Sequence, residues 1–221
     1  EGKRYVKETT PQNEVAVAPY DAQNIYMIMY HNENRPWNQD ELAVSSVFDE
    51  YFGGSMNSIV FQEMREARGL AYSAGASYNW PWRKGDFEDF NTFIITQNDK
   101  MMDCIKQFNE ILDNVPQSQA AFNVAKDALK KKLASRRVTK FGLISKYLSN
   151  KRLGIDYDKN ERIYNGLDKV TMKDIVDYEK RLMANKTYRY LILGNEKALD
   201  MDALGKIAPV KHLSTETIFG Y

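Results

Sequence analysis

The sequence predicts an α+β fold in which an antiparallel-rich sheet carries helices packed on one face. Strand-like and helix-like patterns fall in separate blocks, in the order β–α–α–β–β–α–α–α–β, and one hairpin pattern joins two neighbouring strands. The 221 residues are 43% hydrophobic, which is enough for a real core. We therefore expect one domain over residues 1–221, with a core over about 14–195 and a C-terminal arm over 196–221.

The first elements follow from local patterns. Residues 15–30 are rich in β-branched and aromatic side chains, which predicts one long bent strand or two short ones. Asn38, with Glu41 three positions later, resembles a capping box and opens a helix that a glycine pair ends. Ser55 is the expected N-cap of a second helix, which Gly69 stops. The apolar stripe of the first helix is Val44, Val47, Phe48, Tyr51 and Phe52.

The later elements are a hairpin, five further helices and a closing strand. The hairpin joins extended stretches at 71–78 and 87–96 through a connection that contains Pro81 and Gly85. Helical patterns follow around Cys104, after Ser118, at 143–148, after Thr171 with Asp174, and as a small helix at 201–206; a strand spans 188–193. The spacing around Cys104 predicts a buried, structural thiol.

Composition excludes several classes of function. Lys and Arg number 31 and Asp and Glu 30, so a net charge of +1 gives no general attraction to nucleic acid or to acidic membranes. No apolar run approaches the roughly 20 residues of a membrane-spanning helix. The sequence starts without Met or a signal stretch, as expected of an excised fragment, and leaves the compartment open: cytoplasm, or periplasm and cell envelope if a signal precedes it.

A basic stretch lies on one predicted helix. A solvated helical face explains it, and the alternative is an acidic partner or nucleic acid, although no aromatic platform accompanies it. The residues are Lys126, Lys130, Lys131, Lys132, Arg136, Arg137 and Lys140.

The sequence lacks the residues of a hydrolytic centre. Its two histidines, His31 and His212, are far apart, and neither belongs to an H-E-x-x-H or H-x-x-E-H motif. Neither a G-x-S-x-G elbow nor a phosphate-binding loop is present. We therefore expect no metal, no cofactor and no catalytic residue in this chain.

The segment 52–73, FGGSMNSIVFQEMREARGLAYS, resembles the second-domain signature of the pitrilysin/insulinase family of inverted-zinc metallopeptidases, which includes the mitochondrial processing peptidases. Residues 170–175 and the strand ending at 193–195 resemble that family's closing helix and strand. The resemblance implies two facing α+β domains, with zinc and H-x-x-E-H on an N-terminal catalytic lobe, in the same or a separate polypeptide. It also implies that Arg65 and Tyr72 contact an extended peptide substrate.

The residue chemistry agrees with these implied roles. Arg65 offers a permanent cation with five donors, and Tyr72 offers a phenol that can donate to a peptide carbonyl. The alternatives are a local ion pair for Arg65 and a half-buried strand position for Tyr72. Arg68 is a secondary candidate for a substrate contact; the alternative is a helix-end cation that serves the helix dipole or a surface ion pair. Trp80 and Trp82 at the hairpin tip form either an inter-lobe or substrate contact surface or part of the packing.

These observations predict a non-catalytic, substrate-binding and assembly lobe of a zinc metallopeptidase. The alternative is an inactive structural or interaction subunit with the same fold, which an upstream or neighbouring H-x-x-E-H would distinguish. A weaker third hypothesis, a basic-patch binding protein, predicts salt-dependent retention of nucleic acid.

Overall fold

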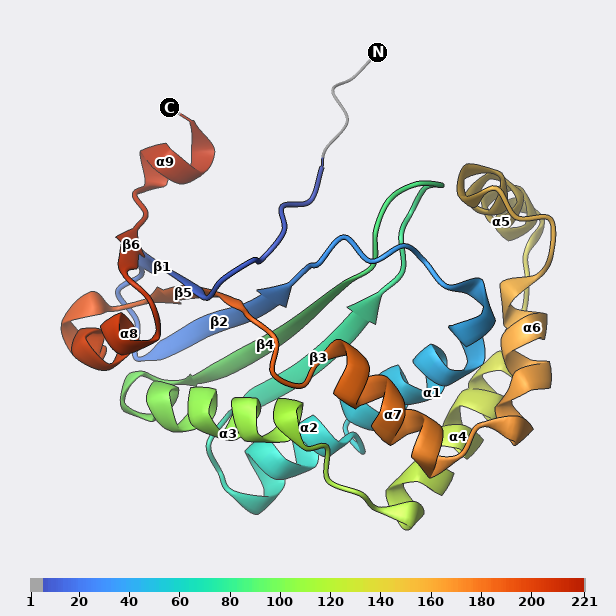
Figure 1. Ribbon diagram of the computed structural model, residues 1–221, viewed down its shortest axis with the longest axis horizontal. Coiled ribbons are helices and arrows are strands. Elements are labelled where there is room, and N and C mark those ends of the chain that lie inside the picture. Colours follow the sequence, from blue (N-terminus) through green and yellow to red (C-terminus); the bar gives the residue numbers. More distant parts are fainter. Residues whose placement is uncertain (1–5, 221) are drawn as a thin grey trace.

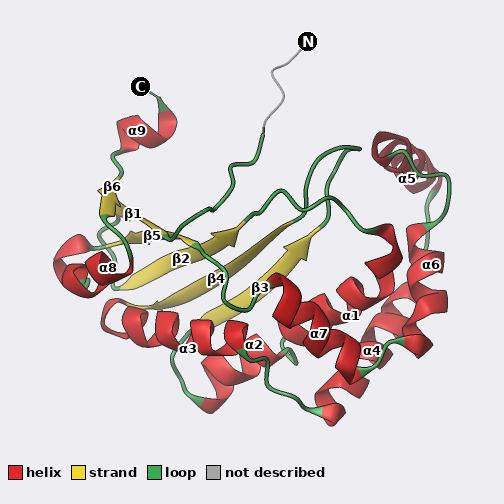
Figure 2. Cartoon of the chain, in the orientation of Figure 1, coloured by secondary structure: helices red, strands yellow, loops and turns green. Residues whose placement is uncertain are grey.

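A computed structural model describes residues 6–220, which form one six-stranded mixed sheet with most of the helices gathered against one face (Figures 1 and 2). The sheet order is β3-β4-β2-β5-β1-β6. The strands are β1 (Glu14–Pro19), β2 (Asn24–His31), β3 (Ser73–Asn79), β4 (Asp89–Gln97), β5 (Arg189–Gly194) and β6 (Val210–His212). The pairs β3–β4, β4–β2 and β2–β5 are antiparallel, whereas β1 runs parallel to both β5 and β6.

The helices follow the predicted blocks, with two additions. They are α1 (Leu42–Phe52), α2 (Ile59–Phe61), a π-helical segment (Gln62–Ala67), α3 (Met101–Asp113), α4 (Gln119–Ala134), α5 (Lys140–Leu153), α6 (Lys159–Gly166), α7 (Met172–Leu182), α8 (Met201–Ile207) and α9 (Thr215–Phe219). Helices α6 and α9 were not predicted. In Figure 1, α1, α3 and α7 lie on the same side of the sheet, and α5 lies at the end of the molecule opposite to α8.

Alternation along β2 shows which face the helices cover. Ile25, Met27 and Met29 are almost completely buried, and they pack in one cluster with the apolar sides of the helices. Tyr26 and Ile28, between them, are about half exposed on the opposite face. The predicted α+β architecture, with helices against one face of the sheet, is therefore confirmed; the sheet itself is mixed.

Two segments take places in the sheet that local sequence patterns do not predict. Residues 15–30 form two strands, β1 and β2, yet β5 lies between them in the sheet. The arm after residue 195 contributes β6, which pairs with β1.

At Thr171, the predicted start of α7, a complete capping box forms: the Thr171 side chain accepts from the Asp174 amide, and the Asp174 carboxylate accepts from the Thr171 amide.

One predicted cap forms only in part, and another is wrong. The Asn38 side chain accepts from the Asp40 amide at 3.1 Å, and Glu41 does not close the box because its carboxylate binds the guanidinium groups of Arg35 and Arg181, each at 2.6 Å. Two cations attract this carboxylate more strongly than one amide does. Ser58, rather than Ser55, caps α2.

Candidate functional site

The chain turns sharply between the π-helical segment and β3, and this turn carries Arg65 and Tyr72. Leu70 and Ala71 both donate their amides to the Met64 carbonyl, at 2.9 and 3.1 Å. Gly69 provides the required positive φ of 58°. The Tyr72 amide then donates to the Ile95 carbonyl at 2.8 Å, which fixes Tyr72 at the start of β3 against β4.

The turn brings Arg65 and Tyr72 together on the surface. The Arg65 guanidinium lies 5.7 Å from the centre of the Tyr72 ring and 5.1 Å from that of Phe61, within the range of cation–π attraction. Tyr72 is 73% exposed and is therefore not the half-buried strand aromatic of the alternative hypothesis. Arg65 does have a local carboxylate, Glu66, at 3.6 Å, but both side chains are about half exposed and such pairs are weak.

Arg68 ends the π-helical segment, three residues after Arg65. Its Nε lies 3.6 Å from the Glu63 carboxylate, and its side chain is about half exposed. The pair is too long for a strong hydrogen bond, so Arg68 remains free to turn toward a ligand. Its role as a secondary substrate contact stays a prediction.

Trp80 and Trp82 lie at the other end of β3, roughly 26 Å from Tyr72 at the usual rise of a strand. Trp80 is half-buried: its indole N–H donates to Ser45 at 3.1 Å and its ring packs near Trp37. Trp82 is 78% exposed. The structure therefore places the tryptophans and the Arg65/Tyr72 pair in two separate regions, and leaves only Trp82 as a largely exposed contact residue.

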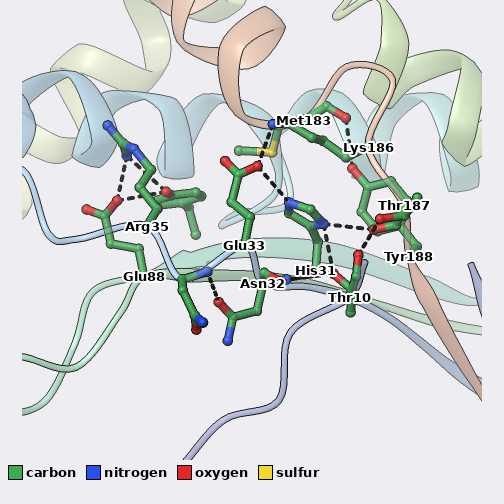
Figure 3. Close-up of polar contacts among 12 residues, drawn as sticks. Thr10, His31, Asn32, Glu33, Arg35, Glu88, Met183, Lys186, Thr187 and Tyr188 are labelled. Carbon is green, nitrogen blue, oxygen red and sulfur yellow. Dashed lines mark hydrogen bonds and ion pairs between the residues drawn. The ribbon is translucent and has the colours of Figure 1, made fainter. Parts of the chain in front are cut away.

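Figure 3 shows that His31 ties three segments together. Its Nδ1–H donates to the Thr187 carbonyl at 2.7 Å, and Thr10 lies 3.0 Å from the same nitrogen. Burial lowers the pKa of the imidazole. His212 lies on β6, with β5 and β1 between it and β2. Within residues 6–220, no group of three or more His, Cys, Asp or Glu side chains is arranged to hold a metal ion, so these residues do not fit a zinc site.

Sequence reasoning missed a largely buried network around Arg35, of which Figure 3 shows the pair of Arg35 and Glu88. Its guanidinium donates to Glu88 at 2.5 Å, to Glu41 at 2.6 Å and to the Tyr78 hydroxyl at 3.0 Å. Burial raises the pKa of both Tyr78 and Glu88. The network joins the segment after β2 to the hairpin of β3 and β4, and the wide spacing of its members in the sequence gave no signal for it.

The structure thus defines an α+β lobe that exposes an Arg/Tyr pair and, in its described part, holds no clustered metal ligands. Residues 2–129, more than half of the chain, match the sequence profile of the peptidase M16 inactive domain. The chain belongs to this family. A search of curated proteins finds no match.

Solved structures share the fold at low sequence identity. The peptidase M16 inactive domain from Pseudomonas fluorescens matches with a TM-score of 0.70 and 13% identity, over 90% of this chain and 47% of that one. A conserved protein from Enterococcus faecalis (0.67, 17%, 87% and 44%) and a protease from Helicobacter pylori (0.64, 14%, 84% and 46%) are similar. The chain spans less than half the length of each of these proteins. No helix among residues 6–220 has the length and apolar character to cross a membrane.

Proposed function

We propose that this chain is the substrate-binding and assembly lobe of a zinc metallopeptidase whose zinc and catalytic residues lie on an N-terminal lobe, in the same or a separate polypeptide. The observation that carries the proposal is the Arg65/Tyr72 pair: two strong donors, both exposed, held side by side at a rigid turn. The family membership supports it, because the family is that of the inactive domain of a peptidase.

In this proposal the two side chains bind and polarise the carbonyl of an extended peptide. The Tyr72 hydroxyl donates to the carbonyl oxygen, and the Arg65 guanidinium stabilises the negative charge that develops there. The ring stacking holds both donors before substrate arrives, which reduces the entropy lost on binding. A zinc ion on the other lobe would supply the activated water.

The assembly part of the proposal is supported by the uncovered face of the sheet. Tyr26 is in register with Leu193 on β5, and Ile28 is in register with Phe93 on β4. All four side chains are more than a third exposed, and they lie next to one another on the face without helices. A contiguous apolar surface of this kind is typical of a protein contact.

Helix α5 is a second surface of the same kind. Phe141, Ile144 and Leu148 recur at helical spacing yet are 79%, 59% and 46% exposed, and only Leu153 at its end is buried. A helix that turns its apolar side to solvent is stabilised when another protein surface covers it. Because the chain spans less than half of its structural relatives, another lobe is the natural partner for both surfaces.

The alternative, an inactive interaction subunit, would keep both apolar surfaces and make Arg65 and Tyr72 dispensable. Nucleic-acid binding by the basic stretch is less favoured. Lys126 already donates to the Val170 carbonyl at 2.9 Å, Lys130 binds Asp168 at 3.0 Å, and Lys132 lies 3.5 Å from Glu50. Part of the positive charge is thus balanced within the chain.

Steady-state kinetics of the assembled protein test the proposal. Arg65→Ala and Tyr72→Phe should each lower kcat about 10- to 100-fold. Removal of one oxyanion donor from a fully closed site lowers kcat roughly 10²- to 10³-fold, and these two donors are more exposed. Zinc content and thermal stability should not change. Arg136→Ala and Tyr164→Phe are matched controls away from the pair. If both test variants stay within about twofold of the parent, about 0.4 kcal/mol, the inactive-subunit alternative holds.

A further inference from the structure

A cleft of about 570 Å³ lies at the end of β3 that is remote from Tyr72, between α1, the hairpin tip and helices α4 and α5. This volume is within the usual range of ligand sites. Its aromatic wall contains Trp80 and Trp82, and its charged lining contains Asp49, Glu50, Lys132, Arg152 and Lys159.

Lys159 is a half-buried cation on the rim of this cleft. It stands at the first position of α6, and its ammonium lies 5.7 Å from the centre of the Trp80 ring. Within residues 6–220, no carboxylate approaches it within ion-pair distance; the neighbouring Asp158 binds Lys146 instead. Burial lowers the pKa of Lys159, as expected for an ammonium whose lost hydration is not replaced by a partner.

Arg152 supplies a second uncommitted cation. Its backbone is fixed at the end of α5, where its carbonyl accepts from the Lys84 amide at 2.8 Å and the next residue, Leu153, is buried. In the described part of the chain its guanidinium has no carboxylate partner. The planar donors of a guanidinium match the two oxygens of a carboxylate.

The acidic residues of the cleft do not neutralise these two cations. Glu50 lies 3.5 Å from Lys132. Asp49 accepts from the Tyr78 amide at 3.2 Å, and burial raises its pKa to about 6. The remaining positive charge lies beside two indole rings, an arrangement suited to a ligand with both an anionic group and an apolar part.

We propose that this cleft binds a carboxylate group of a peptide, with Lys159 and Arg152 as its cationic partners and the indoles of Trp80 and Trp82 against the adjoining apolar residue. The proposal rests on the proposed function and deepens it, since it names peptides that carry a carboxylate as the favoured substrates. The carboxylate belongs either to an acidic side chain or to the C-terminus. An extended peptide that reaches from the cleft to Tyr72, roughly 26 Å, needs about eight residues.

The test measures binding of three synthetic twelve-residue peptides to the full chain by tryptophan fluorescence. The first carries one central Glu and an amidated end, the second carries Gln in its place and a free C-terminal carboxylate, and the third carries Gln and an amidated end. At least one of the first two should bind ten or more times tighter than the third. Whichever binds tighter identifies the source of the carboxylate.

Variants assign the effect to the cleft. Lys159→Gln and Arg152→Gln should each weaken binding five- to tenfold, whereas Lys206→Gln on α8 is the matched surface control and should not. Asp49→Asn should tighten binding a few-fold because it removes the opposing charge. Lys159→Arg keeps the charge and should retain affinity, which guards against a Gln variant that merely fails to fold; thermal unfolding checks each variant.

Three results would overturn the proposal: equal affinity for all three peptides, an equal effect of Lys159→Gln and Lys206→Gln, or binding only to vesicles that contain phosphatidylserine. Arg65→Ala removes the contact at the turn equally for all three peptides, so it should leave the ratio of affinities between the peptides with and without a carboxylate unchanged. The peptide measurement needs no catalytic lobe. Failure of the cleft proposal therefore shows in peptide binding, whereas failure of the Arg65/Tyr72 proposal shows in the kinetics of the assembled protein.

Discussion

The two faces of the sheet differ in what covers them, and strand β4 shows the contrast within four residues. Phe90 is 1% exposed and packs with the helices, near Phe52 and Tyr188. Phe93, on the other face, is 45% exposed, and its ring lies against Gly75. Both positions are apolar, so hydrophobic pattern alone does not separate a core residue from an interface residue.

The contrast indicates that the covered face holds the fold together; under the proposed function, a partner covers the open face. A large aromatic residue that stabilises the chain must lose water on folding, and only Phe90 does so here. Phe93 gains this stabilisation only when another surface covers it. The following variants test that division, and they are ordered by the size of the expected effect.

The first prediction compares the same substitution, phenylalanine to alanine, at two positions of β4. Phe90→Ala should lower the free energy of unfolding by about 3–5 kcal/mol, because it removes a buried ring and leaves a cavity. Phe93→Ala should cost about 1 kcal/mol or less in the isolated chain. Denaturant unfolding measures both. Similar losses for the two variants would show that the open face also belongs to the core.

The second prediction concerns a carboxyl group that is buried on the covered side of the sheet. Glu179 on α7 is completely buried, and this burial, reinforced by Asp113, raises the pKa of its carboxyl to about 7. The folded state therefore holds a proton that the unfolded state releases near pH 4.5, and stability falls as the pH rises from about 4.5 to 7. Glu179→Gln should remove this fall and stabilise the chain by up to about 3 kcal/mol above pH 7.

Unfolding free energies measured from pH 4 to 8 check this second prediction. The curves of parent and Glu179→Gln should meet near pH 4 and separate as the pH rises. Parallel curves across the range would mean that the carboxyl titrates equally in the folded and unfolded states.

The third substitutes the open face. Tyr26→Lys and Ile28→Lys should weaken association with the catalytic lobe at least tenfold, about 1.4 kcal/mol, because each places a charge in an apolar contact. Unfolding of the isolated chain should change by only about 0.5 kcal/mol. Val124→Lys, an exposed position on α4, is the matched control. Unchanged association would leave the open face without a role in assembly.

The smallest expected effect belongs to Arg68. Its side chain is tied weakly to Glu63, so Arg68→Ala should lower kcat/KM of the assembled protein about two- to threefold, less than Arg65→Ala does. A larger loss than for Arg65→Ala would make Arg68 the main cationic contact.

Sequence patterns predicted the elements whose signals are local. The capping residues Ser118 and Thr171 open α4 and α7, and the hairpin of β3 and β4 forms as expected. The placement of β5 between β1 and β2 was not predicted, because strand order depends on contacts across more than 150 residues. For α5, the helix was predicted but its exposure was not, since an apolar stripe has the same appearance whether this chain or another covers it.

The candidate site was predicted only in part. Arg65 and Tyr72 were found through a motif, and the structure adds that they touch one another. Lys159 and Arg152 were not singled out, because their shared cleft with Trp80 depends on how α5 and α6 return to the hairpin. No local sequence pattern indicates that α5 and α6 pack near the hairpin. Of the residues around the cleft, the sequence analysis singled out Trp80 and Trp82 as a possible contact surface.

Reconstitution tests the central claim most directly. The chain, the catalytic lobe and their mixture are each assayed on an unstructured peptide, with zinc measured in each sample. The chain alone should neither hydrolyse the peptide nor hold stoichiometric zinc, and its addition to the catalytic lobe should raise kcat/KM at least tenfold, whereas a chain with Arg65→Ala and Tyr72→Phe should associate without this gain. Hydrolysis by the chain alone that a chelator stops and zinc restores, or full activity of the catalytic lobe without the chain, would contradict the claim.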